Sequence, residues 1–192
     1  MMEASDNGQF LQMIYNHITP QQVNVDFING YLSPWALLMD YCTHEAGFTY
    51  FFKQMNKAGN LHETVRQNIE SVVGTTHRDS GFADSVAWLT ENNGLIEIAN
   101  WETNLTTHLL VWFNNLQKTL ITSFRNVWPD DFLLKDFIEV LKGLFTNQFV
   151  RCWKLEEQTK NGLYYDWGGI GFDDFFFESR QHFYHLHFEL SD

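Results

Sequence analysis

Two histidines and a glutamate recur at every second position near the end of the chain, as His185, His187 and Glu189. In a β-strand such residues project from one face, about 7 Å apart, so two imidazoles can bind one metal ion. Glu189 would then be a third ligand or the general base of a metal-dependent hydrolase. The same spacing is also that of the polar face of an ordinary amphipathic strand. Neither a His-Glu-x-x-His nor a Cys-x-x-Cys motif adds support for a metal.

The segment that carries these residues alternates in the manner of a β-strand. Tyr184, Leu186, Phe188 and Leu190 share the face opposite the histidines. The period changes to this pattern after Phe149, and the turn residues that follow divide the region into short strands. We expect strands at 149–156, 163–167, 172–178 and 182–190, joined by Asn161-Gly162, the Gly168–Gly171 loop and Ser179-Arg180.

The earlier part of the chain has mainly helical spacing. Helix starts are indicated by Thr19-Pro20, Ser33-Pro34 and Asn60, each a capping residue ahead of an apolar pattern. The clearest pattern covers 104–128 and ends at Pro129. The first expected helix runs from Pro20 to Gly30, and the second from Pro34 to about Lys57 with a break near Gly47. Further helices are expected over 61–73, over a short stretch from Phe82, over 104–128, and from Asp130 or Asp131 onward. The run 95–98 fits either a strand or a helix.

These elements predict an α+β fold. The helical three-quarters, about 1–147, would pack on an antiparallel sheet of three or four strands formed by about 148–192. A sheet of about 45 residues needs helices to cover its apolar face. The sequence therefore predicts a single domain over 1–192.

Charge is distributed unevenly along the chain. The net charge is −12, from 24 acidic and 12 basic residues. Residues 1–52 hold five acidic residues and no base, and residues 161–192 hold six acidic residues and one base. Such a surface repels nucleic acid and anionic membranes and attracts basic proteins. A net charge of this kind also serves solubility alone.

Other features of the sequence exclude several functions. The Gly168–Gly171 stretch lacks the lysine and helix start of a phosphate-binding loop, and no Gly-x-Ser-x-Gly elbow occurs. Cys42 and Cys152 match no metal or redox spacing and are expected to be buried thiols in a reducing cytosol. The first residues lack the pattern of a signal peptide, and no apolar run is long enough to span a membrane. We expect a cytoplasmic protein with no cofactor.

The first functional hypothesis is a non-enzymatic binding protein. Its acidic, aromatic C-terminal sheet and loop would bind a basic protein, most concretely as the immunity partner (antitoxin) of a bacterial toxin or as an inhibitor of another basic enzyme. The predicted contact residues are Asp166, Trp167, Asp173, Asp174 and Glu178.

Two alternatives remain open. One is the metal-dependent hydrolase built on His185, His187 and Glu189. The other is an anti-defence protein that mimics DNA with its carboxylates, for which the nearly balanced middle of the chain, with 13 acidic and 11 basic residues, is poor in charge.

Overall fold

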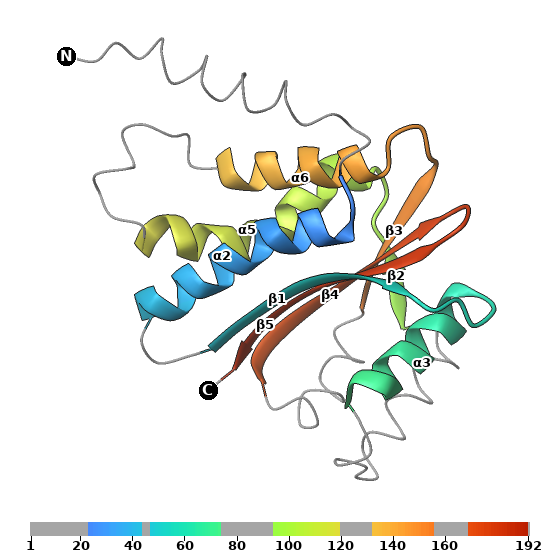
Figure 1. Ribbon diagram of the computed structural model, residues 1–192, viewed down its shortest axis with the longest axis horizontal. Coiled ribbons are helices and arrows are strands. Elements are labelled where there is room, and N and C mark those ends of the chain that lie inside the picture. The colour runs from blue at the N-terminus through green and yellow to red at the C-terminus, as the bar shows by residue number, and fades with distance from the viewer. Residues whose placement is uncertain (1–22, 44–46, 74–93, 120–131, 156–168, 192) are drawn as a thin grey trace.

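The computed structural model describes residues 23–43, 47–73, 94–119, 132–155 and 169–191 (Figure 1). Within these segments the fold is α+β, as predicted, with four helices and five strands. None of the described helices is long and apolar enough to cross a membrane. The helices are α2 (Val25–Thr43), α3 (Leu61–Val73), α5 (Trp101–Thr119) and α6 (Phe132–Leu144), and the strands are β1 (Gly47–Met55), β2 (Leu95–Glu97), β3 (Val150–Leu155), β4 (Gly169–Ser179) and β5 (Phe183–Ser191).

The strands form one antiparallel sheet in the order β1-β5-β4-β3-β2. The prediction of three or four strands confined to the C-terminal quarter is wrong, because β1 and β2 come from the part expected to be helical. β1 adds to the edge of β5 along its whole length, from Gly47 opposite Ser191 to Met55 opposite Phe183. This pairing joins residues that are 128 to 144 positions apart, as the difference between paired residue numbers shows, and no local pattern records it.

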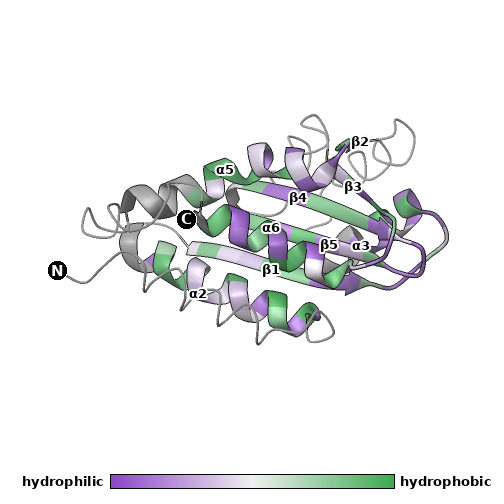
Figure 2. Ribbon diagram, turned by 90° about the horizontal axis from the view of Figure 1, so that it is seen from above, coloured by the Kyte–Doolittle hydropathy of each residue, from purple (hydrophilic) through white to green (hydrophobic). Residues whose placement is uncertain are grey.

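Three helices cover one face of the sheet, and the fourth lies on the other face (Figure 1). Figure 2 shows α2, α6 and α5 side by side above the strands. Between them and the sheet lies an aromatic core that includes Phe52, Phe113, Phe137, Phe177 and Phe188. On the α3 face a smaller apolar cluster comprises Met55, Leu61, Val65, Leu95, Leu155, Phe172, Phe176 and Phe183. Both faces of the sheet are therefore partly buried.

The predicted helix through Phe51 and Phe52 is wrong, because this segment is the edge strand β1. Helix α2 protects that edge. The Asn29 side chain accepts from the Phe52 N–H and donates to the Phe52 C=O, both over 2.7 Å. Asp40 accepts from the Phe48 N–H over 2.6 Å. An edge strand has no neighbour on one side and so presents a row of unpaired backbone groups. The Asn29 and Asp40 side chains bond some of those groups in place of a neighbouring strand.

Helix α2 also continues through the predicted break at Gly30 and the predicted start at Pro34. Pro34 has no N–H to donate to the Gly30 carbonyl. Because both residues are exposed, water can hydrate that carbonyl instead. The helix predicted from Asn60 is confirmed, since the Asn60 side chain caps the N–H of Glu63 over 2.9 Å.

Other boundaries changed or lie outside the described residues. The predicted Gly168–Gly171 loop is wrong from Gly169 onward, because β4 begins there with an irregular register between Gly169 and Gly171. The open run at 95–98 begins as the short strand β2. The Thr19-Pro20 helix start, the short helix from Phe82 and the strand at 163–167 lie outside the described residues.

Candidate metal centre

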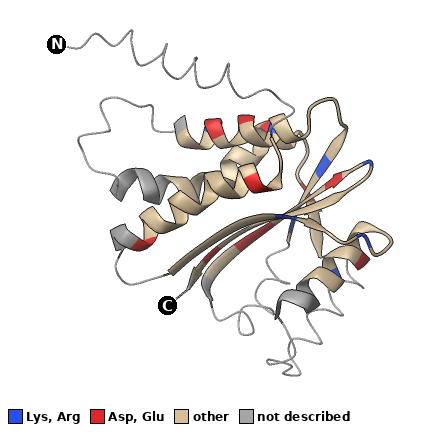
Figure 3. Cartoon of the chain, in the orientation of Figure 1, with Lys and Arg blue, Asp and Glu red and all other residues tan. Residues whose placement is uncertain are grey.

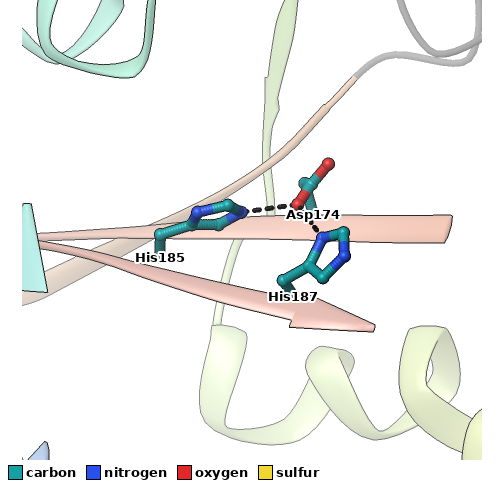
Figure 4. Close-up of side chains that lie close together, drawn as sticks. All are labelled: Asp174, His185 and His187. Carbon is teal, nitrogen blue, oxygen red and sulfur yellow. Dashed lines mark hydrogen bonds and ion pairs between the residues drawn. The ribbon is translucent and has the colours of Figure 1, made fainter. Parts of the chain in front are cut away.

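Asp174, His185 and His187 meet on the α3 face of the sheet. The β4–β5 register sets Asp174 directly opposite His187 and sets Phe176 opposite His185. Strand alternation turns all four side chains to the same face. Figure 4 shows the carboxyl group and the two imidazoles pointing toward one another.

The carboxyl group of Asp174 binds both rings through one oxygen. Asp174 Oδ1 lies 2.5 Å from His185 Nε2 and 2.8 Å from His187 Nδ1. All three residues are buried, with at most 3% of any of them exposed. The other oxygen, Oδ2, is buried and has no hydrogen-bond partner among the described residues. Such an atom indicates a missing water, ion or ligand.

The outer nitrogen of each ring is held by a further polar side chain. Glu189 Oε2 lies 3.3 Å from His187 Nε2, and Asn68 Nδ2, from α3, lies 3.2 Å from His185 Nδ1. Metal-binding histidines characteristically have such a partner on the nitrogen that faces away from the metal. A half-turn of the Asn68 amide would present its oxygen to a protonated Nδ1 and leave Nε2 for a metal.

Aromatic rings enclose the two histidines. Phe51 stacks on His187 with ring centroids 4.7 Å apart, and Phe176 stacks on His185 at the same distance. Phe172 stacks more distantly on His187, at 6.5 Å. These rings exclude water and lower the local dielectric, which strengthens every electrostatic interaction within the cluster.

The environment shifts the three pKa values apart. Burial raises the pKa of Asp174, but the charges and hydrogen bonds of His187 and His185 outweigh it and hold the pKa well below its usual range. Burial lowers the pKa of His187, yet Asp174 and Glu189 together raise it to about 9. For His185 burial dominates, and its pKa is lowered. The metal-free cluster at neutral pH is thus an aspartate, a protonated His187 and a neutral His185.

This arrangement suits a divalent transition-metal ion. One ligand atom from each residue lies within 4.8 Å of the others. Zinc sits about 2.1 Å from its nitrogen and oxygen ligands, which places those atoms about 3.4 Å apart in a tetrahedron. The two separations between Asp174 Oδ1 and the imidazole nitrogens therefore need to widen by less than about 1 Å. Binding would displace the proton from His187, as metal binding to imidazole generally does.

The sequence placed His185, His187 and Glu189 on one face, and the structure agrees. It differs in the residue that could be a third ligand, which is Asp174 on β4, while Glu189 contacts the far nitrogen of His187. The only sequence signal for Asp174 was its place in a neighbouring strand of the predicted sheet. Without the register, that strand could not be aligned with β5.

Of the five predicted partner-binding residues, the three that the structure describes are not gathered on one surface. Asp174 is fully buried, and Asp173 is 6% exposed, accepts from Trp112 Nε1 over 2.7 Å and pairs with Lys154 at 3.3 Å. These two positions do not suit direct contact with another protein. Glu178 is partly exposed beside Arg151 at 3.6 Å, and Asp166 and Trp167 lie outside the described residues.

Acidic residues in the described segments are dispersed over helices and strands with basic residues among them (Figure 3). Several of their carboxylates are engaged within the fold, such as that of Asp40 on the β1 backbone. A single acidic face is therefore not evident in this part of the chain.

No protein-family model matches the chain, and no curated protein matches it. Among solved structures, a crystal structure of citrus MAF1 is similar with a TM-score of 0.44 and 12% sequence identity. The likeness covers 84% of this chain and 98% of that one. It is too slight to assign a family or a function.

Proposed function

We propose that this protein binds a zinc-like divalent metal ion through Asp174, His185 and His187 and is a metal-dependent hydrolase. The observation that supports it is the convergence of one carboxylate and two imidazoles, all buried, on a point within reach of one ion. This combination of nitrogen and oxygen ligands is one that zinc and related ions favour.

The buried Asp174 oxygen argues for a metal over a purely structural hydrogen-bond network. A buried carboxylate is costly unless each of its oxygens is bonded or its charge is paired. His185 and His187 both bond Oδ1, while Oδ2 has no partner among the described residues. A metal ion bound at Oδ2, or at both oxygens, would satisfy the unbonded oxygen and replace the proton of His187 as the counter-charge.

The number of candidate ligands supports the hydrolase part of this proposal. Three protein ligands leave the fourth tetrahedral position to water, and a zinc-bound water loses its proton near neutral pH. A metal held by these residues would supply the nucleophile for hydrolysis of an ester, amide or phosphoester. Glu189 orients His187 in this scheme, in place of the ligand role predicted from the sequence.

The direct test is metal stoichiometry of the full chain. After chelation and dialysis, titration with Zn²⁺ or Co²⁺ should give one bound ion per chain, and Co²⁺ should show the intense visible bands of tetrahedral coordination. Asp174→Asn, His185→Gln and His187→Gln should each weaken binding by about 100-fold or more.

His182→Gln is the matched control, because His182 precedes the same strand but is exposed. It should bind metal like the unaltered chain. Absence of stoichiometric metal, or equal affinity in all four variants, would overturn the proposal. Release of product from a generic ester or phosphoester by the loaded protein then tests the hydrolase part separately.

The inhibitor of a basic protein remains a second proposal, supported by the net charge of −12 and by the excess of acidic residues in 161–192. Among the predicted contact residues, Glu178 is the one that the structure places at the surface. Recovery of one basic partner from host lysate at low salt, its loss at high salt, and weaker recovery by Glu178→Lys would support it. Recovery that is insensitive to both changes would count against it.

A further inference from the structure

Lys53 lies beside the proposed metal centre. It stands on β1 directly opposite His185 in the β1–β5 ladder, while Phe51 stands opposite His187. Side chains paired in this way have Cβ atoms about 5 Å apart and share a face of the sheet. The central strands therefore present two adjacent rows, Lys53–His185–Phe176 and Phe51–His187–Asp174.

In the described part of the chain, the ammonium group of Lys53 has an aromatic ring as its neighbour. It lies 5.2 Å from the centroid of the Phe51 ring. No hydrogen bond or ion pair joins it to any described residue, although the side chain is half-buried. Half-buried lysines ordinarily extend the ammonium to water or to a carboxylate. A cation held beside a metal centre is thus available to a ligand.

We propose that the metal ion and Lys53 together bind a small oxyanion, the carboxylate or phosphate group of the substrate. This inference rests on the proposed metal site and names its substrate class. One oxygen of the anion would add to the metal as a fifth ligand beside the bound water, and another would accept from the Lys53 ammonium.

The charges of the loaded site favour this ligand. With both histidines neutral as ligands, a divalent ion, Asp174 and Lys53 leave two positive charges, and Glu189 reduces them to one. The surrounding Phe51 and Phe176 rings hold water away and weaken screening. An anion that bridges the metal ion and the Lys53 ammonium would offset their mutual repulsion, and the two cations would balance its negative charge.

The experiment uses the full chain loaded with Co²⁺, whose visible spectrum reports a change in the coordination of the ion. Acetate and inorganic phosphate are titrated separately. Saturable spectral change is expected with at least one of them, and the anion that binds more tightly identifies the carboxylate or the phosphate class. Lys53→Met should weaken that binding by about tenfold and leave Co²⁺ affinity within about threefold, as loss of one charge-assisted hydrogen bond predicts.

Two further variants make the result specific. Lys53→Arg keeps the charge and should retain most of the anion affinity. Lys57→Met is the matched control, because Lys57 is exposed and lies over the Phe183 ring at 5.3 Å, away from the histidine rows. It should bind both ions normally.

Different failures have different meanings. If Co²⁺ binds but neither anion changes its spectrum, or if Lys53→Met binds the anion as well as the unaltered chain, the oxyanion inference is wrong and the metal site stands. If Co²⁺ does not bind to the three-residue site, the proposed function and this inference both fall.

Discussion

Asp174 and His187 face each other across the β4–β5 ladder, and 2.8 Å separates Asp174 Oδ1 from His187 Nδ1. The two residues come from the two arms of one hairpin, whose turn is fixed by bonds between Ser179 and His182. A shift of one residue in this register would turn every histidine of β5 to the helical face. The candidate site thus depends on the same contacts that align the sheet.

Replacing Asp174 should destabilise the metal-free protein. Asp174→Asn removes the one carboxylate among the described residues that contacts both histidines, and none of these three residues is more than 3% exposed. Breaking a buried ion pair costs about 3 to 5 kcal/mol, and we expect a loss near the lower limit because the amide still accepts a hydrogen bond. Urea denaturation after chelation measures it. The control Glu178→Gln, at a partly exposed position on β4, should change the free energy of unfolding by less than about 1 kcal/mol.

Replacing Glu189 should weaken metal binding without abolishing it. Glu189→Gln keeps a hydrogen-bond acceptor at His187 Nε2 but removes the carboxylate that makes the ring more basic. We expect metal affinity to fall by about 10-fold to 100-fold with the stoichiometry unchanged. Competition between the protein and a coloured chelator measures this affinity. An unchanged affinity would show that Glu189 does not support His187, and a complete loss would instead make it a ligand.

Removing the Asn29 side chain should open the edge of the sheet. Asn29→Ala leaves the N–H and C=O of the buried residue Phe52 without their partners. We expect a loss of about 2 to 3 kcal/mol in the free energy of unfolding and faster hydrogen exchange at the Phe52 amide. Ser33→Ala removes an exposed bond to the Asn29 carbonyl from the same helix and should cost less than about 0.5 kcal/mol. Equal effects of the two substitutions would contradict this account of the edge.

The stability contributed by Asp136 should decrease as the pH rises. Burial and the charge of Glu139 raise the pKa of Asp136 from 3.8 to about 6. Between these values the folded protein holds a proton that the unfolded chain has released, so stability falls as the pH rises from about 4 through 6. We compare the free energy of unfolding of Asp136→Asn with that of the unaltered chain. This difference should be more favourable to the variant at pH 7 than at pH 4, by on the order of 1 kcal/mol once partial exposure of the carboxyl group is allowed for.

Urea denaturation of both proteins at the two pH values measures this change. The variant amide oxygen still accepts from the Tyr31 hydroxyl, so that bond is retained. A difference between the two proteins that does not vary with pH would contradict the raised pKa.

Parts of the fold were predictable because their signals are local. The Asn60 cap and the apolar spacing of the helix expected after Pro129 depend on contacts three or four residues apart, and α3 and α6 both form there. The segment 48–55 had no such clear signal. Its apolar residues at 48, 50, 51, 52 and 55 fit a helix as readily as a strand, and pairing with β5 decides the outcome.

By itself the sequence determined which residues of the last strand share a face. His185, His187 and Glu189 lie on one side, with Tyr184, Leu186 and Phe188 on the other, because alternation is a property of any extended chain. Only the tertiary structure decided that the histidine face is buried, that Asp174 is its third member and that Lys53 stands beside it. Those facts depend on the alignment of β1 and β4 with β5 and on helix α3 covering that face, and such long-range contacts leave no periodic trace in the chain.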